Sequence, residues 1–108
     1  MAYVKASELI VGELQAIADA ARPIHNLTVD VQFLPDGFQA LDPPERFRNI
    51  AVKMESNGSD ASVLLVNCHF DSTVGGPGAG DNAANCAVMI EVLRVLANDR
   101  SGHYSHFY

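Results

Sequence analysis

The residues of this chain best suited to chemistry lie between positions 66 and 82. His69 and Asp71 stand two positions apart, so on an extended segment both side chains point to the same side. An imidazole that binds a metal usually has its second ring nitrogen held by a hydrogen bond, often to a carboxylate. A His-x-Asp sequence at the end of a strand supplies that arrangement, so His69 is a candidate metal ligand and Asp71 its orienting acid.

A further carboxylate, Asp81, follows the glycine-rich loop of residues 75–80. The glycines allow the loop to fold tightly, so that His69 and Asp81 can converge. A carboxylate at this position can cap the helix that we expect to begin there, and its two oxygens can also bridge two cations.

Each of these residues also has an ordinary structural role. A single histidine after a strand is more often structural than a ligand, and a single aspartate before a helix is usually its N-cap. A glycine-rich loop can be a plain connector. The pattern alone leaves both interpretations open, but an apolar strand before it and an apolar helix after it favour a site, because open α/β sheets bind ligands there.

A phosphate-binding loop is the rival interpretation of the glycines. Gly75 and Gly80 have the required Gly-x-x-x-x-Gly spacing, but Asp81 and Asn82 stand where that loop needs Lys and Ser or Thr. An acidic side chain at the start of a helix repels a phosphate, so we exclude nucleotide binding.

The spacing of apolar residues predicts the elements that position this site. Residues 3–21 have one apolar face at helical spacing before Pro23, which predicts an amphipathic helix. Residues 27–33 and 47–55 alternate apolar and polar side chains, as half-buried strands do. Residues 62–68 form a nearly continuous apolar run, typical of an interior strand covered on both faces, and we expect it to pair antiparallel with 47–55.

Residues 82–97 predict a helix that is apolar almost all round, which is typical of a buried helix. A buried helix must be covered by other elements, and few residues of the chain remain to form them. Proline and glycine breakers at 35–37 and 43–44 predict a loop between the first two strands. The order of elements indicates an α/β layer with an unfinished sheet over 1–98, followed by an irregular tail at 99–108.

Composition excludes several classes of function. The chain has 108 residues, enough for one small domain, and a net charge of −6. That charge argues against a nucleic-acid binder and against attachment to an anionic membrane surface. No apolar run reaches the roughly 20 residues of a membrane span, and the first residues lack the pattern of a signal peptide.

The two cysteines and two glycosylation sequons give weaker signals. Cys68 and Cys86 are too few for a disulfide scaffold and fit no zinc finger, so two buried free thiols are the favoured interpretation, while a single disulfide stays open. The sequons begin at Asn26 and Asn57, where we expect exposed turns, and together they favour the secretory pathway.

A resemblance to a known family rests on the run VLLVNCHFDSTVGGPGAGDNAANCAVMIEVLRVL. It is similar to the metal-binding core of the aminopeptidase family of zinc exopeptidases with paired zincs, and most similar to their endoplasmic reticulum metallopeptidase group. The resemblance is strong over residues 61–97, weaker over 1–60, and absent after about residue 98. It implies that residues 1–98 are the amino-terminal part of a three-layer α/β/α peptidase domain with a mixed sheet, truncated here.

The resemblance also implies roles for individual residues. His69 matches the first zinc ligand, Asp71 the catalytic residue that orients it, and Asp81 the carboxylate that bridges both zincs. Asn82 replaces a second Asp found in many members, although Asn also occurs there. The implied activity is removal of terminal residues from a peptide substrate by a metal-activated water, with two zinc ions per complete site.

Some parts of the family's site have no match in this chain. The family needs a Glu-Glu pair, a later Asp and a later His, and none of the five glutamates is paired with another: Glu8, Glu13, Glu45, Glu55 and Glu91. Catalytic zinc normally takes about three protein ligands plus water. We therefore expect this chain alone to be inactive. The tail histidines, His103 and His106, are three positions apart and could in principle add ligands, but an irregular terminus is the favoured interpretation.

Two functional hypotheses follow. The first is a zinc exopeptidase present as an incomplete chain, whose parent protein the resemblance places on the lumenal side of the endoplasmic reticulum membrane, attached through segments absent from this chain. The second is a non-catalytic truncated module that associates with another chain through its unfinished sheet and uncovered helix. A compact soluble monomer would count against the second hypothesis.

Overall fold

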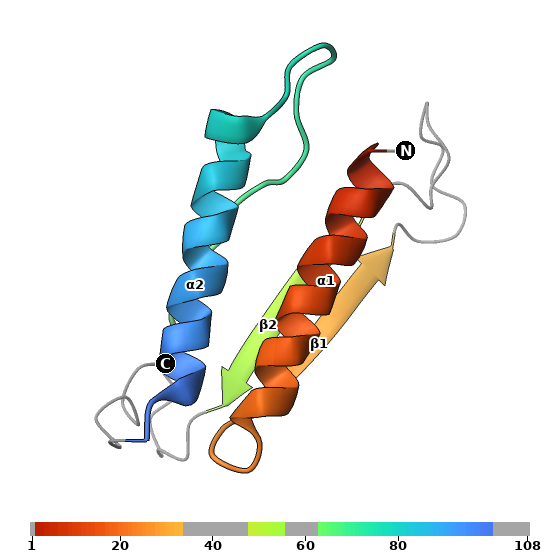
Figure 1. The fold of residues 1–108 in the computed structure, drawn as a ribbon. Coiled ribbons are helices and arrows are strands. Elements are labelled where there is room, and N and C mark those ends of the chain that lie inside the picture. The colour runs from red at the N-terminus through yellow and green to blue at the C-terminus, as the bar shows by residue number, and fades with distance from the viewer. Residues whose placement is uncertain (1, 34–47, 56–62, 101–108) are drawn as a thin grey trace.

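The computed structural model describes residues 2–33, 48–55 and 63–100. Its elements follow in the order α1 (Ala2–Ala21), β1 (Asn26–Phe33), β2 (Arg48–Glu55), the π-helical turn η2 (Ala79–Ala83) and α2 (Ala84–Asn98). The helices lie beside a two-stranded antiparallel sheet, which makes a partial α/β domain and confirms the predicted fold class (Figure 1).

The predicted amphipathic helix is confirmed as α1. Its buried face consists of residues at helical spacing: Ser7, Leu14, Ile17, Ala18 and Ala21. The helix ends at a turn in which the backbone N–H groups of Ile24 and His25 donate to the carbonyl oxygen of Ala21, at 2.8 and 3.1 Å. Pro23 lies within that turn and has no N–H with which to continue the helix.

Both predicted alternating strands are confirmed as β1 and β2. They pair antiparallel with each other, with Leu27 opposite Met54 and Val29 opposite Val52. These four side chains lie on the face that the helices cover, while the intervening residues are mostly exposed. The period-two pattern therefore gives the sheet one apolar face, which packs against the helices. Figure 1 shows α1 lying across the sheet.

A small apolar core joins the helices to the sheet. Its buried members are Ile17, Ala18, Ala21, Leu27 and Ala97, and the partly buried side chains around them are Val29, Val52, Met54, Ile90 and Leu93. An ion pair also links the two helices, because Arg94 Nη2 lies 3.0 Å from Glu13 Oε2. The core fixes α2, and with it the loop that precedes α2, relative to α1 and the sheet.

The interior strand predicted over residues 62–68 is wrong for the part that the structure describes. Residues 63–70 form no regular element, and the side chains of Val63 and Leu65 are 85% and 82% exposed. The segment rises behind α2 in the direction opposite to β2 but makes no ladder with it (Figure 1). An apolar run becomes an interior strand only between neighbouring strands and under cover on both faces, and the described residues provide neither.

The predicted buried helix is only partly confirmed. It forms as α2, but it begins at Ala84, two residues later than predicted, and only Cys86 and Ala97 are buried. One face carries exposed valines: Val88 (61%), Val92 (52%) and Val95 (59%). The prediction of a fully buried helix was wrong, because no element among residues 2–33, 48–55 and 63–100 packs on the face that carries these valines.

Several other predictions fall on residues that the structure does not describe. They concern the breakers at 35–37 and 43–44, the sequon at Asn57, and the tail with His103 and His106. The domain boundary at 98/99 stays a prediction. Within the described ranges, neither helix has the length and apolar character needed to cross a membrane.

Candidate metal site

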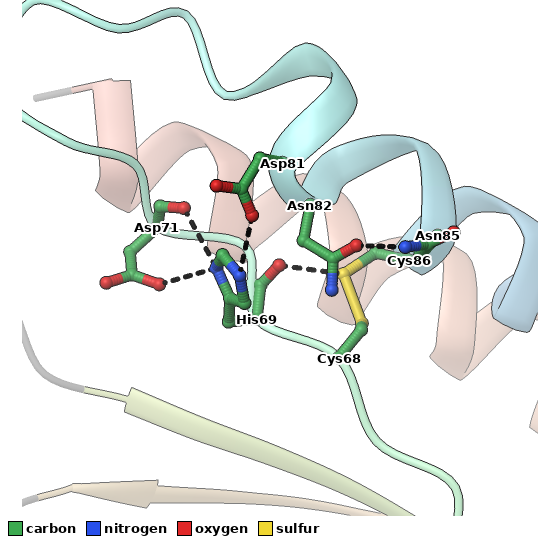
Figure 2. The surroundings of a disulfide bond; sticks show 7 residues. All are labelled: Cys68, His69, Asp71, Asp81, Asn82, Asn85 and Cys86. Carbon is green, nitrogen blue, oxygen red and sulfur yellow. Dashed lines mark hydrogen bonds and ion pairs between the residues drawn. A yellow bond between two sulfur atoms is a disulfide. The ribbon is translucent and has the colours of Figure 1, made fainter.

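The structure brings together the three side chains that the sequence marks as candidates for metal chemistry. His69 Nε2 lies 3.1 Å from Asp81 Oδ1. On the other side of the ring, His69 Nδ1 lies 3.2 Å from Asp71 Oδ1 and 3.2 Å from the backbone carbonyl oxygen of Asp71. Figure 2 shows the imidazole between the two carboxylates, one from its own segment and one from the turn before α2.

The loop that joins these groups needs glycine at two positions. Gly75 and Gly78 have φ of 84° and 67°, in the left-handed region that other residues rarely adopt. A Cβ atom at Gly78 would also lie 2.7 Å from Ser72 Cβ. The Ser72 hydroxyl donates to the carbonyl oxygen of Gly76 at 2.9 Å and closes the loop. This compact loop is what returns the chain from Asp71 to Asp81.

The carboxylate of Asp81 does not cap the helix. Asp81 lies inside η2 with φ −125° and ψ 87°, values that are not helical. The N-cap of α2 is Ala83, and no side-chain hydrogen bond caps it. The capping interpretation of Asp81 is therefore wrong, and its side chain, 90% exposed, faces His69 instead.

The charges around His69 favour a cation at the ring. The pKa of His69 is raised, first by the hydrogen bond to the backbone carbonyl of Asp71, and also by the negative charges of Asp81 and Asp71, while loss of hydration opposes the rise. A ring nitrogen and a carboxylate oxygen at 3.1 Å repel each other when both present lone pairs, so a proton or a metal ion must lie between them.

The same pair of atoms fits a shared metal ion. With zinc–ligand bonds of about 2.1 Å and tetrahedral angles, two ligand atoms on one zinc stand about 3.4 Å apart. The observed 3.1 Å between His69 Nε2 and Asp81 Oδ1 is close to that separation. Asp71 accepts from Nδ1, which leaves Nε2 as the nitrogen available to a metal. Among the described residues, however, no group of three or more His, Cys, Asp or Glu side chains is arranged to hold one metal.

A disulfide bond flanks the site. Cys68 and Cys86 are bonded, with their Cα atoms 5.7 Å apart, so the favoured prediction of free thiols is wrong and the alternative that was left open is correct. The bond joins the segment that carries His69 to α2, and Cys86 Sγ lies 3.2 Å from the carbonyl oxygen of His69. A usable signal was present, because the two cysteines flank the residues that were expected to converge, His69 and Asp81.

His69, Asp71 and Asp81 open onto a cavity of about 430 Å³, which residues 72–73 and 76–80 of the loop also line. The sequence reasoning missed one contact beside it, where the ring of Phe70 stacks on that of Tyr3 with the centroids 4.9 Å apart. No pattern in the sequence links those two positions.

Asn26, which was expected in a turn, is the first residue of β1. It is exposed, and its side-chain amide donates a hydrogen bond to the carboxylate of Glu55.

An imidazole and a carboxylate that converge beside an α/β sheet form the kind of site that metal-dependent hydrolases use. A sequence profile of Peptidase family M28 matches residues 49–105, more than half of the chain. The chain therefore belongs to peptidase family M28.

Similar proteins include endoplasmic reticulum metallopeptidase 1 of Mus musculus, 35% identical over 97 residues, which are 83% of this chain and 11% of the mouse protein. The Homo sapiens protein of the same name is 37% identical over 92 residues, 79% of this chain and 10% of the human protein. Aminopeptidase YwaD of Bacillus subtilis is 38% identical over 47 residues, 44% of this chain and 10% of that protein. The chain thus spans about a tenth of the length of these relatives. No solved structure matches it.

Proposed function

We propose that this chain carries part of a zinc exopeptidase site, in which His69 and Asp81 bind zinc and Asp71 orients His69. The observation that carries the proposal is the 3.1 Å contact between His69 Nε2 and Asp81 Oδ1. Family membership supports the peptidase class. The relative named an aminopeptidase supports the finer proposal that terminal residues of a peptide substrate are removed.

Each of the three residues has a separate role in this proposal. Asp71 accepts a hydrogen bond from His69 Nδ1, which fixes the tautomer in which Nε2 can bind a metal. Asp81 directs one carboxylate oxygen at the ring and the other away from it, as Figure 2 shows, so it can bridge two cations. When bound, zinc supplies Lewis acidity and lowers the pKa of water, which peptide hydrolysis requires.

We further propose that the chain does not hydrolyse peptides by itself. Catalytic zinc normally takes about three protein ligands, and the described residues offer one nitrogen and one oxygen to a shared ion. Among those residues, no carboxylate other than Asp71 and Asp81 lines the cavity to act as general base. The complete site, with two zinc ions, would take its remaining groups from outside the described residues.

The test is zinc binding by the purified 108-residue chain, measured in two ways. Elemental mass spectrometry after dialysis counts tightly held zinc, and NMR of the His69 ring during a zinc titration detects weak binding. We expect well under one tight zinc per chain, together with a zinc-dependent shift of His69 that Asp81→Asn weakens. The matched control is His25→Ala, because the His25 ring contacts the carbonyl oxygen of Asp99 instead of the site.

Two outcomes would refute parts of the proposal. If the His69 ring does not respond to zinc at any concentration, or responds equally in Asp81→Asn, then His69 and Asp81 are not a ligand pair. If the chain retains one or two zinc ions and releases amino acids from a peptide, then its proposed inactivity is wrong.

We propose the lumenal side of the endoplasmic reticulum as the location of the parent protein. The mouse and human relatives carry that organelle in their names. The bond between Cys68 and Cys86 fits an oxidising compartment, where disulfides form and persist. Attachment to the membrane would use segments other than the described residues. Protection of the parent protein from added protease in sealed microsomes tests this proposal, and cleavage of the peptidase domain in sealed microsomes would contradict it.

A second candidate function is association with another chain. The observations that favour it are the exposed apolar surface of Val88, Val92 and Val95 on α2 and the exposed apolar run at 63–66. Light scattering during size-exclusion chromatography tests it, since a compact monomer at all concentrations would count against a docking function.

A further inference from the structure

His69 lies in a segment that has little local support. Residues 63–70 belong to no helix or strand. Among the described residues, no hydrogen bond between backbone groups joins this segment to another element. Yet the imidazole stands within 3.1 Å of Asp81, a residue of a different element. Something other than secondary structure must hold the ring there.

The residue before His69 is anchored to α2. Cys68 forms a disulfide with Cys86, which is only 6% exposed and lies in the first turns of the helix. That helix follows directly on the turn that carries Asp81. The bond therefore ties the backbone of His69 to the same rigid unit that carries its partner carboxylate.

The residue after His69 is anchored to α1. The ring of Phe70 stacks on that of Tyr3, with an interplanar angle of 17°. Tyr3 is itself fixed to the sheet, because its hydroxyl donates to the carbonyl oxygen of Arg48 at 3.2 Å and accepts from the Arg48 N–H at 3.1 Å. The Arg48 guanidinium donates to the hydroxyl of Ser7, a fully buried residue of α1. Phe70 thus rests on a ring that both α1 and β2 hold in place.

We propose that Tyr3 is a positioning residue of the metal site, acting with the Cys68–Cys86 disulfide as a two-sided clamp on His69. The inference rests on the proposed function, in which His69 is a ligand. The disulfide fixes one end of the short stretch Cys68–Phe70, and the aromatic stack fixes the other. With both ends held, the ring has little freedom to turn away from Asp81, and a cation meets two donors that are already in place.

The test compares Tyr3→Leu, which removes the stacked ring, with Tyr3→Phe, which keeps the ring and loses only the hydroxyl. Phe33→Leu is the matched control, because it removes an aromatic ring that contacts the Arg48 guanidinium but not Phe70. Each variant of the 108-residue chain is titrated with zinc chloride while NMR records the His69 ring. The nuclear Overhauser effect between the ring of His69 and the β-protons of Asp81 is measured without metal.

We expect Tyr3→Leu to weaken zinc binding by roughly 10-fold, the lower end of what loss of a group supporting a metal ligand costs. It should also weaken the Overhauser effect. Tyr3→Phe keeps the stacked ring but loses both hydrogen bonds to Arg48, so it should lose less than Tyr3→Leu in both measurements. Phe33→Leu should remain close to the unmodified chain. Reduction of the disulfide should lower the affinity of every variant further, because the two anchors act on opposite sides of His69. Cross-strand contacts between Leu27 and Met54 report whether each variant keeps its fold.

Unchanged affinity and an unchanged Overhauser effect in a folded Tyr3→Leu chain would overturn the clamp. Equal losses in Tyr3→Leu and Tyr3→Phe would overturn it too, because the stack would then not be the cause. If Tyr3→Leu does not fold, Phe70→Leu against Phe70→Tyr makes the same comparison from the opposite ring. If zinc leaves the unmodified chain unaffected, the proposed function fails, and the Overhauser effects alone decide whether the clamp exists.

Discussion

Reduction of the Cys68–Cys86 disulfide should destabilise the chain by an amount that its position allows us to calculate. The two cysteines are separated by 18 positions. Closing a loop of that length removes about 11 cal/mol/K of entropy from the unfolded chain, or about 3 kcal/mol at room temperature. Small domains have a total stability of only about 5–15 kcal/mol. Loss of this crosslink should therefore remove a large share of the stability.

The assay is urea unfolding followed by circular dichroism, with and without a phosphine reductant. Reduction leaves both side chains in place, so the measured change excludes the cavity that a substitution of the buried Cys86 would create. We expect reduction to lower the urea concentration at the midpoint of unfolding. The free energy of unfolding should also depend more steeply on urea concentration, because the unfolded chain is less compact without its crosslink. A Cys68→Ser chain is the control, and the reductant should not affect it.

If reduction lowers the free energy of unfolding by less than about 1 kcal/mol, the reasoning is refuted, because the crosslink would then restrict the unfolded chain far less than its loop length predicts. A count of free thiols in the denatured, unreduced chain decides between the two causes. Two free thiols mean that Cys68 and Cys86 are not bonded, whereas none means that residues between them stay confined after unfolding.

Three more predictions concern other parts of the molecule. NMR titration should find the pKa of the His69 ring above its ordinary value, and Asp71→Asn should reduce the shift without abolishing it, because the largest cause is a backbone carbonyl. Protonation of the ring stabilises the folded chain at pH values below the ordinary pKa, and this contribution is lost as the pH rises through the raised pKa. A His69 pKa at its ordinary value would contradict the geometry. Expression in the secretory pathway should add a glycan at the exposed Asn26, detected as a mass that glycosidase removes and Asn26→Gln lacks. Leu27→Ala should lower the free energy of unfolding, measured with urea, by about 2–5 kcal/mol because Leu27 is buried. The control Leu9→Ala changes a residue that is 67% exposed, and it should lower that free energy by less than about 0.5 kcal/mol.

The elements predicted correctly are those whose partners lie close in the sequence or whose pattern is unambiguous. In α1 the apolar residues recur at helical spacing up to Ala21, and in β1 and β2 they alternate. Both patterns need only one covered face, which this chain supplies from its own residues. The periodicity was therefore sufficient to predict them to within one or two residues.

The interior strand failed for the opposite reason. The run that begins at Val63 is apolar on both faces, so its burial depends on neighbours on both sides, and sequence periodicity says nothing about whether those neighbours exist. The same holds for α2, where Val88 and Val92 are more apolar than the buried Ala97 but remain exposed. The apolar pattern of a segment indicates the packing environment that would bury it. Whether that environment exists depends on the elements that surround the segment.

The site itself was more predictable than its scaffold. The convergence of His69 and Asp81 required only a short loop that could turn back, and positive φ angles at Gly75 and Gly78 make that turn. The role of Asp81 as a cap was wrong because the chain passes through the non-helical backbone of η2 before α2 begins. That backbone turns the carboxylate toward the imidazole instead of the helix axis.

The proposed ligand pair, His69 and Asp81, and the contacts that support it differ in how the sequence encodes them. The pair can be predicted from thirteen consecutive residues, because His69, the glycine loop and Asp81 are contiguous in sequence. The stack of Phe70 on Tyr3 joins the first turn of the chain to the site and leaves no local pattern. A chain with only the contiguous motif would hold its ligands loosely, since the segment that carries His69 has no secondary structure of its own. In the proposed site, the distant contacts would therefore decide how well two exposed donors are fixed before a metal binds.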